Sequence, residues 1–295
     1  MISMSMDSAA RGTGLTALFA NPPDDGGVSV GRVASLITFL GPRAENQDRA
    51  FVALMSPQAG QARFVAAVLD GMGGMEEGAK AASLAASTFL QSLATSFTVD
   101  LGAALAMAIS EANAAVWATL QGRGGTTLTA VAMSGSGQCL AVHVGDSRLY
   151  AGLPRPGQLT TDDTPRGLFG SDLGFTPGGL VRFVGAGDRA VFQSLDLTNE
   201  ESDSLLLTTD GFHGAGGEGL SSLLVQPRNA TGAALARLGQ GLRPGDNATA
   251  VLISRSRAMA ELGHAPEGAL LVTSTTEPRD HGSGSARRPP GIADA

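Results

Sequence analysis

Short apolar segments that end on an aspartate recur along this chain. In "RFVAAVLDG" the apolar run stops at Asp70 and Gly71, and in "SLLLTTDGF" it stops just before Asp210. Three further aspartates stand at the ends of apolar runs, namely Asp48, Asp146 and Asp246. If these runs are strands of shared sheets, their ends can meet, so the pattern predicts an acidic cluster at one rim.

A cluster of carboxylates favours a metal site. Like charges gathered in a partly buried place cannot all stay ionised unless a cation neutralises them. Ligands that are all oxygen, with no His or Cys nearby, favour Mg²⁺ or Mn²⁺ over Zn²⁺. A glycine after Asp70 and after Asp210 lets the backbone bend, so that a carbonyl can also face an ion. We therefore interpret Asp70 as a metal ligand at a rigid strand end.

Each acid also has an ordinary explanation. Asp-Gly between apolar runs is the commonest hairpin signal, so turn and ligand are equally good interpretations of Asp70 or Asp210 taken alone. Asp146 in "GDSR" fits a turn, Asp48 fits a helix cap or a surface acid, and Asp246 fits a loop. Only the ordered set favours the metal site over these alternatives.

The order of strands and helices predicts an α+β domain. We expect strands over 33–41, 49–56, 62–69, 202–209 and 247–254, with a hairpin around 135–137. We expect helices over 76–97, 101–120 and 231–242, the first with its acids in its first turn. Antiparallel strands with grouped helices favour a layered arrangement over a βαβ repeat.

Length and composition bound the organisation and the partners of the chain. Its 295 residues suit one large domain, expected over 31–256, and the composition of 1–30 and 257–295 predicts segments without fixed structure. The net charge of −7 argues against nucleic-acid and anionic-membrane partners. A single cysteine, Cys139, excludes internal disulfides and cysteine metal clusters. No signal peptide is recognisable and no apolar run approaches the roughly 20 residues that span a bilayer, so we expect a cytoplasmic protein. We also expect the chain to be a monomer.

Six segments in order resemble the metal-dependent serine/threonine protein phosphatases of type 2C, in their bacterial form. They are "RAENQD", "VLDGMGGMEEGAKAA", "GGTTLTAVAM", "AVHVGDSRLY", "LLLTTDGF" and "DNATAVLI". "QLTTDDT" and "LVRFVG" are similar to two further stretches of the family. The resemblance covers about 32–254, and an ordered combination of this kind is highly specific.

The resemblance implies a sandwich of two antiparallel β-sheets flanked by α-helices (α-β-β-α), with a metal centre in a cleft at one edge. That centre would hold two Mn²⁺ or Mg²⁺ ions and a third, weaker one. Asp70, Asp210 and Asp246 would bind the ions through their carboxylates, and Gly71 through its carbonyl. Asp146, together with Asp210, would correspond to the weaker site.

The resemblance also implies an activity, the hydrolysis of phosphoserine and phosphothreonine in proteins by a metal-activated water. Asp48 would orient that water, and Arg43 would bind the phosphate oxygens through its planar fork of donors. A Ser/Thr kinase and its substrates would be the partners. The alternative is a catalytically weak or inactive domain that acts as a phosphoprotein-binding regulatory module, and a lesser one is a hydrolase of small phosphate esters. The retained acids favour an enzyme, because a binding module has no need of a destabilising charge cluster.

Some positions depart from the family pattern. Gln47 stands where many members have Glu, and Asp163 stands where they usually have His. Met72 follows the bacterial form, whereas eukaryotic members have His there. The stretch 164–181 is short, which predicts a reduced flap over the site. His213 is interpreted as a turn histidine more readily than as a general acid.

Overall fold

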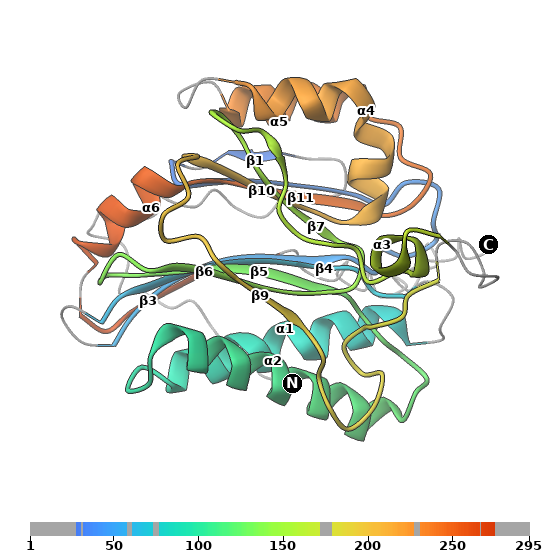
Figure 1. Cartoon of the computed structure of the whole chain (residues 1–295), viewed down its shortest axis with the longest axis horizontal. Helices are drawn as coiled ribbons and strands as arrows, with labels where there is room; N and C mark the ends of the chain where they lie inside the picture. The colour runs from blue at the N-terminus through green and yellow to red at the C-terminus, as the bar shows by residue number, and fades with distance from the viewer. Residues whose placement is uncertain are drawn as a thin grey trace, which may run out of the picture.

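The computed structural model of this chain describes residues 28–30, 32–57, 61–72, 77–171, 179–226, 231–265 and 267–274. Two sheets are stacked face to face, and helices cover the outer face of each (Figure 1). Every strand pair in both sheets is antiparallel. The predicted α-β-β-α sandwich of class α+β is therefore confirmed.

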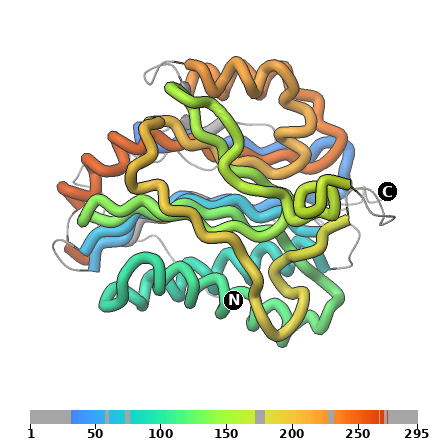
Figure 2. The backbone as a smooth tube through the Cα atoms, viewed as in Figure 1, coloured from blue at the N-terminus to red at the C-terminus, as the bar shows by residue number. Residues whose placement is uncertain are grey.

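Each sheet has six strands among the described residues. The first sheet runs in the order β1 (Val28–Val30), β2 (Ala34–Phe39), β11 (Ala248–Ser254), β10 (Ser204–Thr208), β7 (Arg148–Ala151) and β8 (Gly157–Gln158). The second runs in the order β12 (Ala269–Ser274), β3 (Arg49–Ser56), β4 (Arg63–Leu69), β5 (Leu128–Ser134), β6 (Cys139–Val144) and β9 (Gln193–Asp196). Segments far apart in sequence thus lie side by side, as β2 and β11 do (Figure 2).

The helices pack by layer. The second sheet is covered by α1 (Gly78–Thr95) and α2 (Leu101–Leu120), and the first by α4 (Asp210–Leu224) and α5 (Thr231–Gly241) (Figure 1). The short α3 (Pro165–Phe169) lies at one end of the sandwich, and α6 (Arg255–Leu262) lies at the other (Figure 1).

Alternate residues of β4 face two different cores. Phe64 and Ala66 pack between the sheets, while Val65 and Ala67 pack against α1 and α2. A strand that is buried on both faces needs an uninterrupted apolar sequence, which explains the run in 63–69. Burying each large apolar side chain of this kind contributes about 1.5–3 kcal/mol, so the site at the strand ends rests on a rigid layer.

The expected strands and helices are all present, and α1 differs in detail. The helix begins at Gly78, with Glu77 at its N-cap, and no acid lies in its first turn. The glutamates expected there come before the helix, and residue 76 lies outside the described residues.

Helix α4 was not predicted from the sequence. Its segment, "DGFHGAGGEGLSSLL", is rich in glycine, which disfavours helix, and Gly217 inside it has φ +44° and breaks the helical geometry. The segment is helical because Phe212, Leu220 and Leu223 bury their side chains against the first sheet. Tertiary packing outweighs the local propensity here.

The ordered fold extends beyond the predicted limits 31 and 256. Strand β1 lies within the segment 1–30, and α6 and β12 lie within or across the start of the segment 257–295. Ala258 and Leu262 of α6 are buried in the core between the sheets, and β12 pairs with β3 along its length. The polar composition of the whole tail concealed the apolar segment at 269–274. Residues 1–27 and 275–295 lie outside the described residues.

Helix α2 is long and apolar enough to cross a membrane by length and composition alone, with a mean hydropathy of 1.3. The prediction that no segment approaches this length is wrong in that respect. However, Leu105, Ile109 and Val116 are buried in the core that α2 forms with α1 and the second sheet. Helix α2 therefore buries one face in the protein core, as the core helix of a globular domain does.

Candidate functional site

The ends of four strands place the acids at one rim. Asp48 precedes β3 and Asp70 follows β4, and the antiparallel pairing of Arg49 with Leu69 sets the two acids side by side. In the other sheet, Asp210 follows β10 and Asp246 precedes β11, which pairs with β10 in the same way. Each sheet therefore contributes a pair of acids.

Asp146 comes from the connection that crosses between the sheets. It lies between β6, which ends at Val144, and β7, which begins at Arg148. Its carboxyl group interacts electrostatically with those of Asp70 and Asp210. The crossing connection thus adds an acid from a third point of the rim.

Neighbouring carboxyl groups add to the effect of burial on the pKa of Asp70. For Asp70, burial is the largest cause and holds the pKa well above its usual range, and the charges of Asp48, Asp210 and Asp146 raise it further. A side-chain hydrogen bond with Asp210 acts in the same direction. Asp48, Asp146 and Asp210 therefore lie close enough to Asp70 to disfavour its charged form.

Asp48 is the most deeply placed member, with 1% of its surface exposed. Burial raises its pKa to about 7, the hydroxyls of Thr249 and Thr209 lower it, and the charges of Asp210 and Asp246 raise it. A shift from 3.8 to about 7 corresponds to roughly 4 kcal/mol against the ionised form. Asp48 thus lies beneath the cluster and feels the acids of both sheets.

The pKa of Asp146 is raised to about 7 as well. Burial is the main cause, followed by the charges of Asp210 and Asp162, while Arg148 lowers it. Arg148 is itself engaged by Asp162 through bonds of 2.9 Å from Nε to Oδ1 and 2.7 Å from Nη2 to Oδ2. This arginine therefore does little to neutralise the cluster.

The donor set fits a hard divalent cation. Among the described residues, no three His, Cys, Asp or Glu side chains are positioned to hold one ion as they stand. Yet Oδ1 of Asp48 is buried with no hydrogen-bond partner in that part of the chain, and the neighbouring donors are all oxygens. The side chains of Asp70 and Asp210 share a hydrogen bond, and the charges of Asp48 and Asp146 act on Asp70, so oxygen ligands of the kind that Mg²⁺ and Mn²⁺ prefer lie together at the rim.

Arg43 neutralises one member of the cluster. Its Nη2 lies 2.5 Å from Oδ2 of Asp246, and both side chains are partly exposed. The loop that carries Arg43 is held by the buried Asn247, whose Nδ2 donates to the carbonyls of Leu40 and Glu45 at 2.8 and 3.0 Å. The arginine that the resemblance assigned to phosphate thus lies at the rim, against an assigned metal ligand.

The glycines that follow Asp70 and Asp210 are needed for close backbone approach. A Cβ at Gly71 would lie 2.5 Å from the carbonyl oxygen of Gly78, and one at Gly211 would lie 2.0 Å from that of Asn247. Asp210 and Gly211 begin α4, so the hairpin interpretation is wrong for that pair. Gly71 forms a bridge with Thr126 in place of a hairpin turn.

Two threonines and a serine at the site were missed in the sequence. Thr127 Oγ1 accepts the backbone N–H of Asp70 at 2.8 Å and bonds Oγ of Ser147 at 2.7 Å. Thr126 Oγ1 donates to the carbonyl of Asp70 at 2.8 Å. The two threonines stand in "GGTTLTAVAM" and the serine in "AVHVGDSRLY", two segments that resemble the family, but the resemblance assigned no role to their hydroxyls.

Residues 47, 72 and 163, which were compared with the family pattern, all have defined contacts in the structure. Gln47 accepts the N–H of Gly71 through its own carbonyl at 3.2 Å, and the N–H of Met72 donates to Gly125 at 3.0 Å. Asp163 is fully buried, and its Oδ2 accepts the N–H of Gly145 at 3.0 Å. The predicted flap, 164–181, contains α3 together with residues outside the described ranges, so its reduced size stays a prediction.

His213 lies in the first turn of α4 and not in a turn between elements. Its Nδ1 bonds Oγ1 of Thr208 at 3.1 Å. Burial and the charge of Arg148 lower its pKa to about 4, so the ring is neutral near pH 7. A neutral ring has no proton to spare, which agrees with the preference against a general-acid role.

The chain belongs to the protein phosphatase 2C family, whose pattern it matches over residues 43–240. No protein with curated annotation matches it. Among solved structures, it is similar to the Ser-Thr phosphatase MsPP from Mycobacterium smegmatis in complex with cacodylate, with 27% identity, a TM-score of 0.59, and coverage of 76% of this chain and 98% of that one.

Two further solved structures have the same architecture. PppA from Pseudomonas aeruginosa has 26% identity and a TM-score of 0.58, covering 75% of this chain and 96% of that one. The serine/threonine phosphatase Stp1 from Staphylococcus aureus has 22% identity and a TM-score of 0.63, covering 75% and 94%. At 22% identity, the similarity to Stp1 supports a shared fold and nothing more.

Proposed function

We propose that this chain is a metal-dependent protein phosphatase that hydrolyses phosphoserine and phosphothreonine in proteins. The observation that carries the proposal is the convergence of acids from both sheets at one rim, where Asp210 raises the pKa of Asp48, Asp70 and Asp146. Such a cluster destabilises the folded chain when no cation is bound, and it can hold catalytic metal ions when cations are present. Membership of the phosphatase family gives the class of reaction.

The residues divide into ligands and positioning groups. The carboxylates of Asp70, Asp210 and Asp246 and the carbonyl of Gly71 would hold two Mn²⁺ or Mg²⁺ ions, and Asp146 would serve a third, weaker one. Bound ions of this kind supply Lewis acidity toward water and phosphoryl oxygens. The side chains reach the rim from backbone positions that the strand ends fix, which favours a reproducible geometry.

Two other side chains act on the water and the substrate. Arg43 lies at the exposed rim, where its planar guanidinium can bind two phosphate oxygens at once. Asp48 keeps Oδ1 without a protein partner among the described residues, and so retains an acceptor with which to orient a water. Its Oδ2 is held by the hydroxyl of Thr209 at 2.8 Å, which fixes the direction of that acceptor.

The substrate class rests on the relatives. MsPP, at 27% identity, is described as a Ser-Thr phosphatase. PppA is described as a key regulatory component of the T6SS of its organism. By analogy, we infer that this chain acts on phosphoproteins and opposes a Ser/Thr kinase.

A phosphoprotein-binding regulatory module is the second candidate. Two observations favour it: Arg43 is engaged by Asp246, and among the residues described here no three acids are positioned around one ion. A module of this kind would bind phosphopeptides without turnover. The two candidates differ in whether divalent ions produce hydrolysis.

The deciding experiment combines metal binding with turnover in the full chain. We expect at least two Mn²⁺ ions to bind, and hydrolysis of p-nitrophenyl phosphate and phosphopeptides that EDTA abolishes and Asp210→Asn removes. Asp196→Asn is the matched control, because Asp196 is an exposed acid paired with Leu140, at the opposite end of β6 from the acids. Full turnover in Asp210→Asn would contradict the ligand assignment. No turnover with any divalent ion would favour the binding module, and a preference for sugar phosphates would favour a small-ester hydrolase.

A further inference from the structure

The loop that carries Asp146 is clamped by Asp163. The N–H of Gly145 donates to Oδ2 of Asp163 at 3.0 Å, and the carbonyl of Gly145 accepts the N–H of Asp163 at 2.7 Å. Gly145 has φ +106°, and a Cβ there would lie 2.5 Å from Cγ2 of Thr127. One residue thus holds both polar groups of the strained glycine that precedes Asp146.

The residue on the other side of Asp146 is also fixed. Ser147 is fully buried, its Oγ bonds Oγ1 of Thr127, and its carbonyl accepts Oγ1 of Thr129 at 3.3 Å. Thr127 in turn accepts the N–H of Asp70. The backbone positions of Asp146 and Asp70 are therefore tied to the same threonine.

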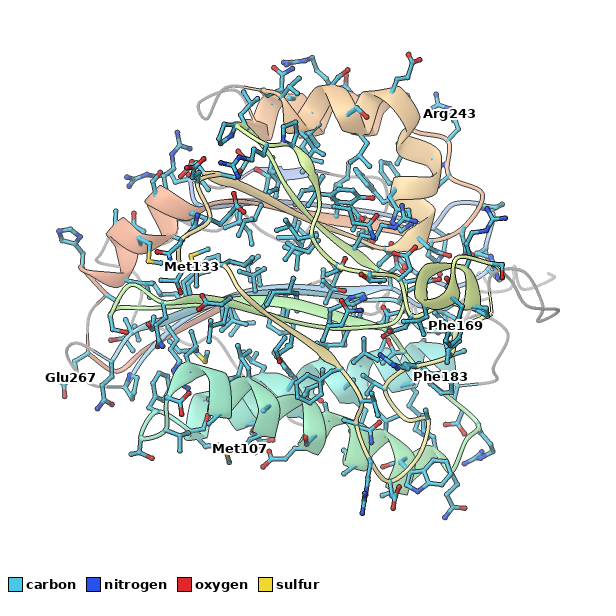
Figure 3. All side chains as sticks on the ribbon, in the orientation of Figure 1. Met107, Met133, Phe169, Phe183, Arg243 and Glu267 are labelled. Carbon is cyan, nitrogen blue, oxygen red and sulfur yellow. The ribbon has the colours of Figure 1, made fainter. Side chains whose placement is uncertain are left out.

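Residues 181–184, here called the strap, connect Asp163 to Thr126, which forms a bridge with Gly71. The N–H of Val181 donates to the carbonyl of Asp163 at 2.7 Å. At the other end of the strap, Val184 exchanges two backbone hydrogen bonds with Thr126, at 3.1 and 2.8 Å. Phe183 of the strap lies at the same end of the molecule as α3, and a Cβ at Gly125 would meet its ring at 2.5 Å (Figure 3).

Arg182 of the strap forms an ion pair with Asp163. Its carboxyl group has no exposed surface, and its Oδ1 lies 3.4 Å from Nη1 of Arg182, whose side chain is about one-third exposed. Burying a polar side chain to this extent is costly unless partners such as Arg182 and the N–H of Gly145 contact it.

We propose that Asp163 and Arg182 form a positioning pair, which holds the loop of Asp146 so that this carboxylate can bind a divalent cation. The inference rests on the proposed function and adds to it a role for the position at which the family usually has His. Neither residue is assigned contact with substrate. Groups that orient metal ligands through hydrogen bonds typically change metal affinity about 10- to 100-fold when they are removed.

The test measures Mn²⁺ binding directly, from the electron paramagnetic resonance signal of free Mn²⁺ during titration of the full chain. In Asp163→Ala we expect the weakest-bound Mn²⁺ to lose about 10- to 100-fold in affinity, while the tighter ions change by less than about threefold. Asp163→Asn keeps an acceptor for Gly145 and should recover part of the loss. Arg182→Gln should shift the same ion in the same direction. Arg189→Gln is the control, because Arg189 is an exposed arginine of the same connection.

Coupling to Asp146 gives a second measurement. If Asp163 acts through Asp146, the double variant Asp146→Asn/Asp163→Ala should bind Mn²⁺ no more weakly than Asp146→Asn alone. At saturating Mn²⁺ the single variants should recover kcat, with KM for the phosphopeptide close to that of the unaltered chain. A merely structural role would instead lower kcat at every Mn²⁺ concentration.

The outcomes separate this inference from the proposed function. Unchanged Mn²⁺ affinities in a folded Asp163→Ala, or additive losses in the double variant, would overturn the positioning role alone. If Asp163→Ala does not fold, Asp163→Asn and Arg182→Gln decide in its place, and two unchanged titrations would overturn the role. If the unaltered chain binds no divalent ion, the proposed function and the inference both fail.

Discussion

Thr209 Oγ1 donates a 2.8 Å hydrogen bond to Oδ2 of Asp48, and this bond joins the two sheets directly beneath the acidic cluster. Thr209 directly follows β10 of one sheet, and Asp48 directly precedes β3 of the other. The same hydroxyl accepts the N–H of Thr249 at 2.9 Å, so its position is fixed from both sides. Because the hydroxyl is used in this way, it does not cap α4, although Thr209 is the N-cap residue.

Removing that hydroxyl should destabilise the fold. Thr209→Val keeps the shape of the side chain but leaves Oδ2 of the buried Asp48 without its donor, which costs about 1–3 kcal/mol of the free energy of unfolding. Thr209→Ser keeps the hydroxyl and is the control. Urea denaturation of the two variants measures the difference, and equal stabilities would show that the bond contributes nothing.

The stability of the metal-free chain should depend on pH in a defined direction. The pKa of Asp48 is about 7 in the folded chain against 3.8 as its ordinary value. A raised pKa means that the folded state holds the proton more tightly, so its contribution is complete below about pH 4 and is lost as the pH rises through about 7.

The measurement is the free energy of unfolding in EDTA at pH values between 5 and 8. We expect a decrease of a few kcal/mol, at most about 4, from the shift of Asp48. Asp48→Asn cannot titrate and should show a shallower dependence on pH, which separates this group from the rest of the chain. Parallel curves for the two proteins would rule out Asp48 as the source.

Gly211 should be the least replaceable glycine of α4. A Cβ there would lie 2.0 Å from the carbonyl oxygen of Asn247, so Gly211→Ala must push the start of α4 away from Asp246, at a cost of about 1–3 kcal/mol. Gly214→Ala in the same helix meets nothing within 4 Å and should stabilise the chain by about 0.5–1 kcal/mol. Thermal melts that shift equally for both variants would contradict the packing argument.

The sequence alone marks the candidate acids, because that signal is local. Each apolar run has the length and continuity of a buried strand, and the acid at its end is visible beside it. The register that sets Asp48 beside Asp70 is not local, since it depends on the pairing of Arg49 with Leu69 across the connection between β3 and β4. The expectation that these acids lie together therefore came from the resemblance to the family and not from the residues alone.

Other parts of the fold and of the candidate site could not be predicted, because they also depend on contacts between residues that are distant in sequence. The helix at 210–224 exists because the first sheet buries its few large side chains, whereas its glycines argue against it. The role of Asp163 depends on contacts with Gly145 and Arg182, which lie 18 and 19 residues away in sequence. The strand at 269–274 forms only because the edge of β3 is there to pair with it. Long-range partners decided each of these cases.

The ion pair between Arg43 and Asp246 should compete with divalent cations. Its two side chains are 45% and 38% exposed, so the pair is worth at most about 1 kcal/mol. Arg43→Ala frees Asp246, and we expect Mn²⁺ to bind up to about fivefold more tightly while kcat/KM for a phosphopeptide falls by about 10-fold or more, because the phosphate loses its planar pair of donors.

Arg43→Lys separates the two effects. Lysine keeps a positive charge near Asp246 and so should keep Mn²⁺ affinity close to that of the unaltered chain, but it cannot form the paired bonds to phosphate and should lose most of the activity. Titration of Mn²⁺ and steady-state kinetics on the same preparations give both quantities. If Arg43→Ala weakens Mn²⁺ binding, the arginine supports the cation site instead of competing with it. If Arg43→Lys retains full kcat/KM, the guanidinium is not the group that binds the phosphate.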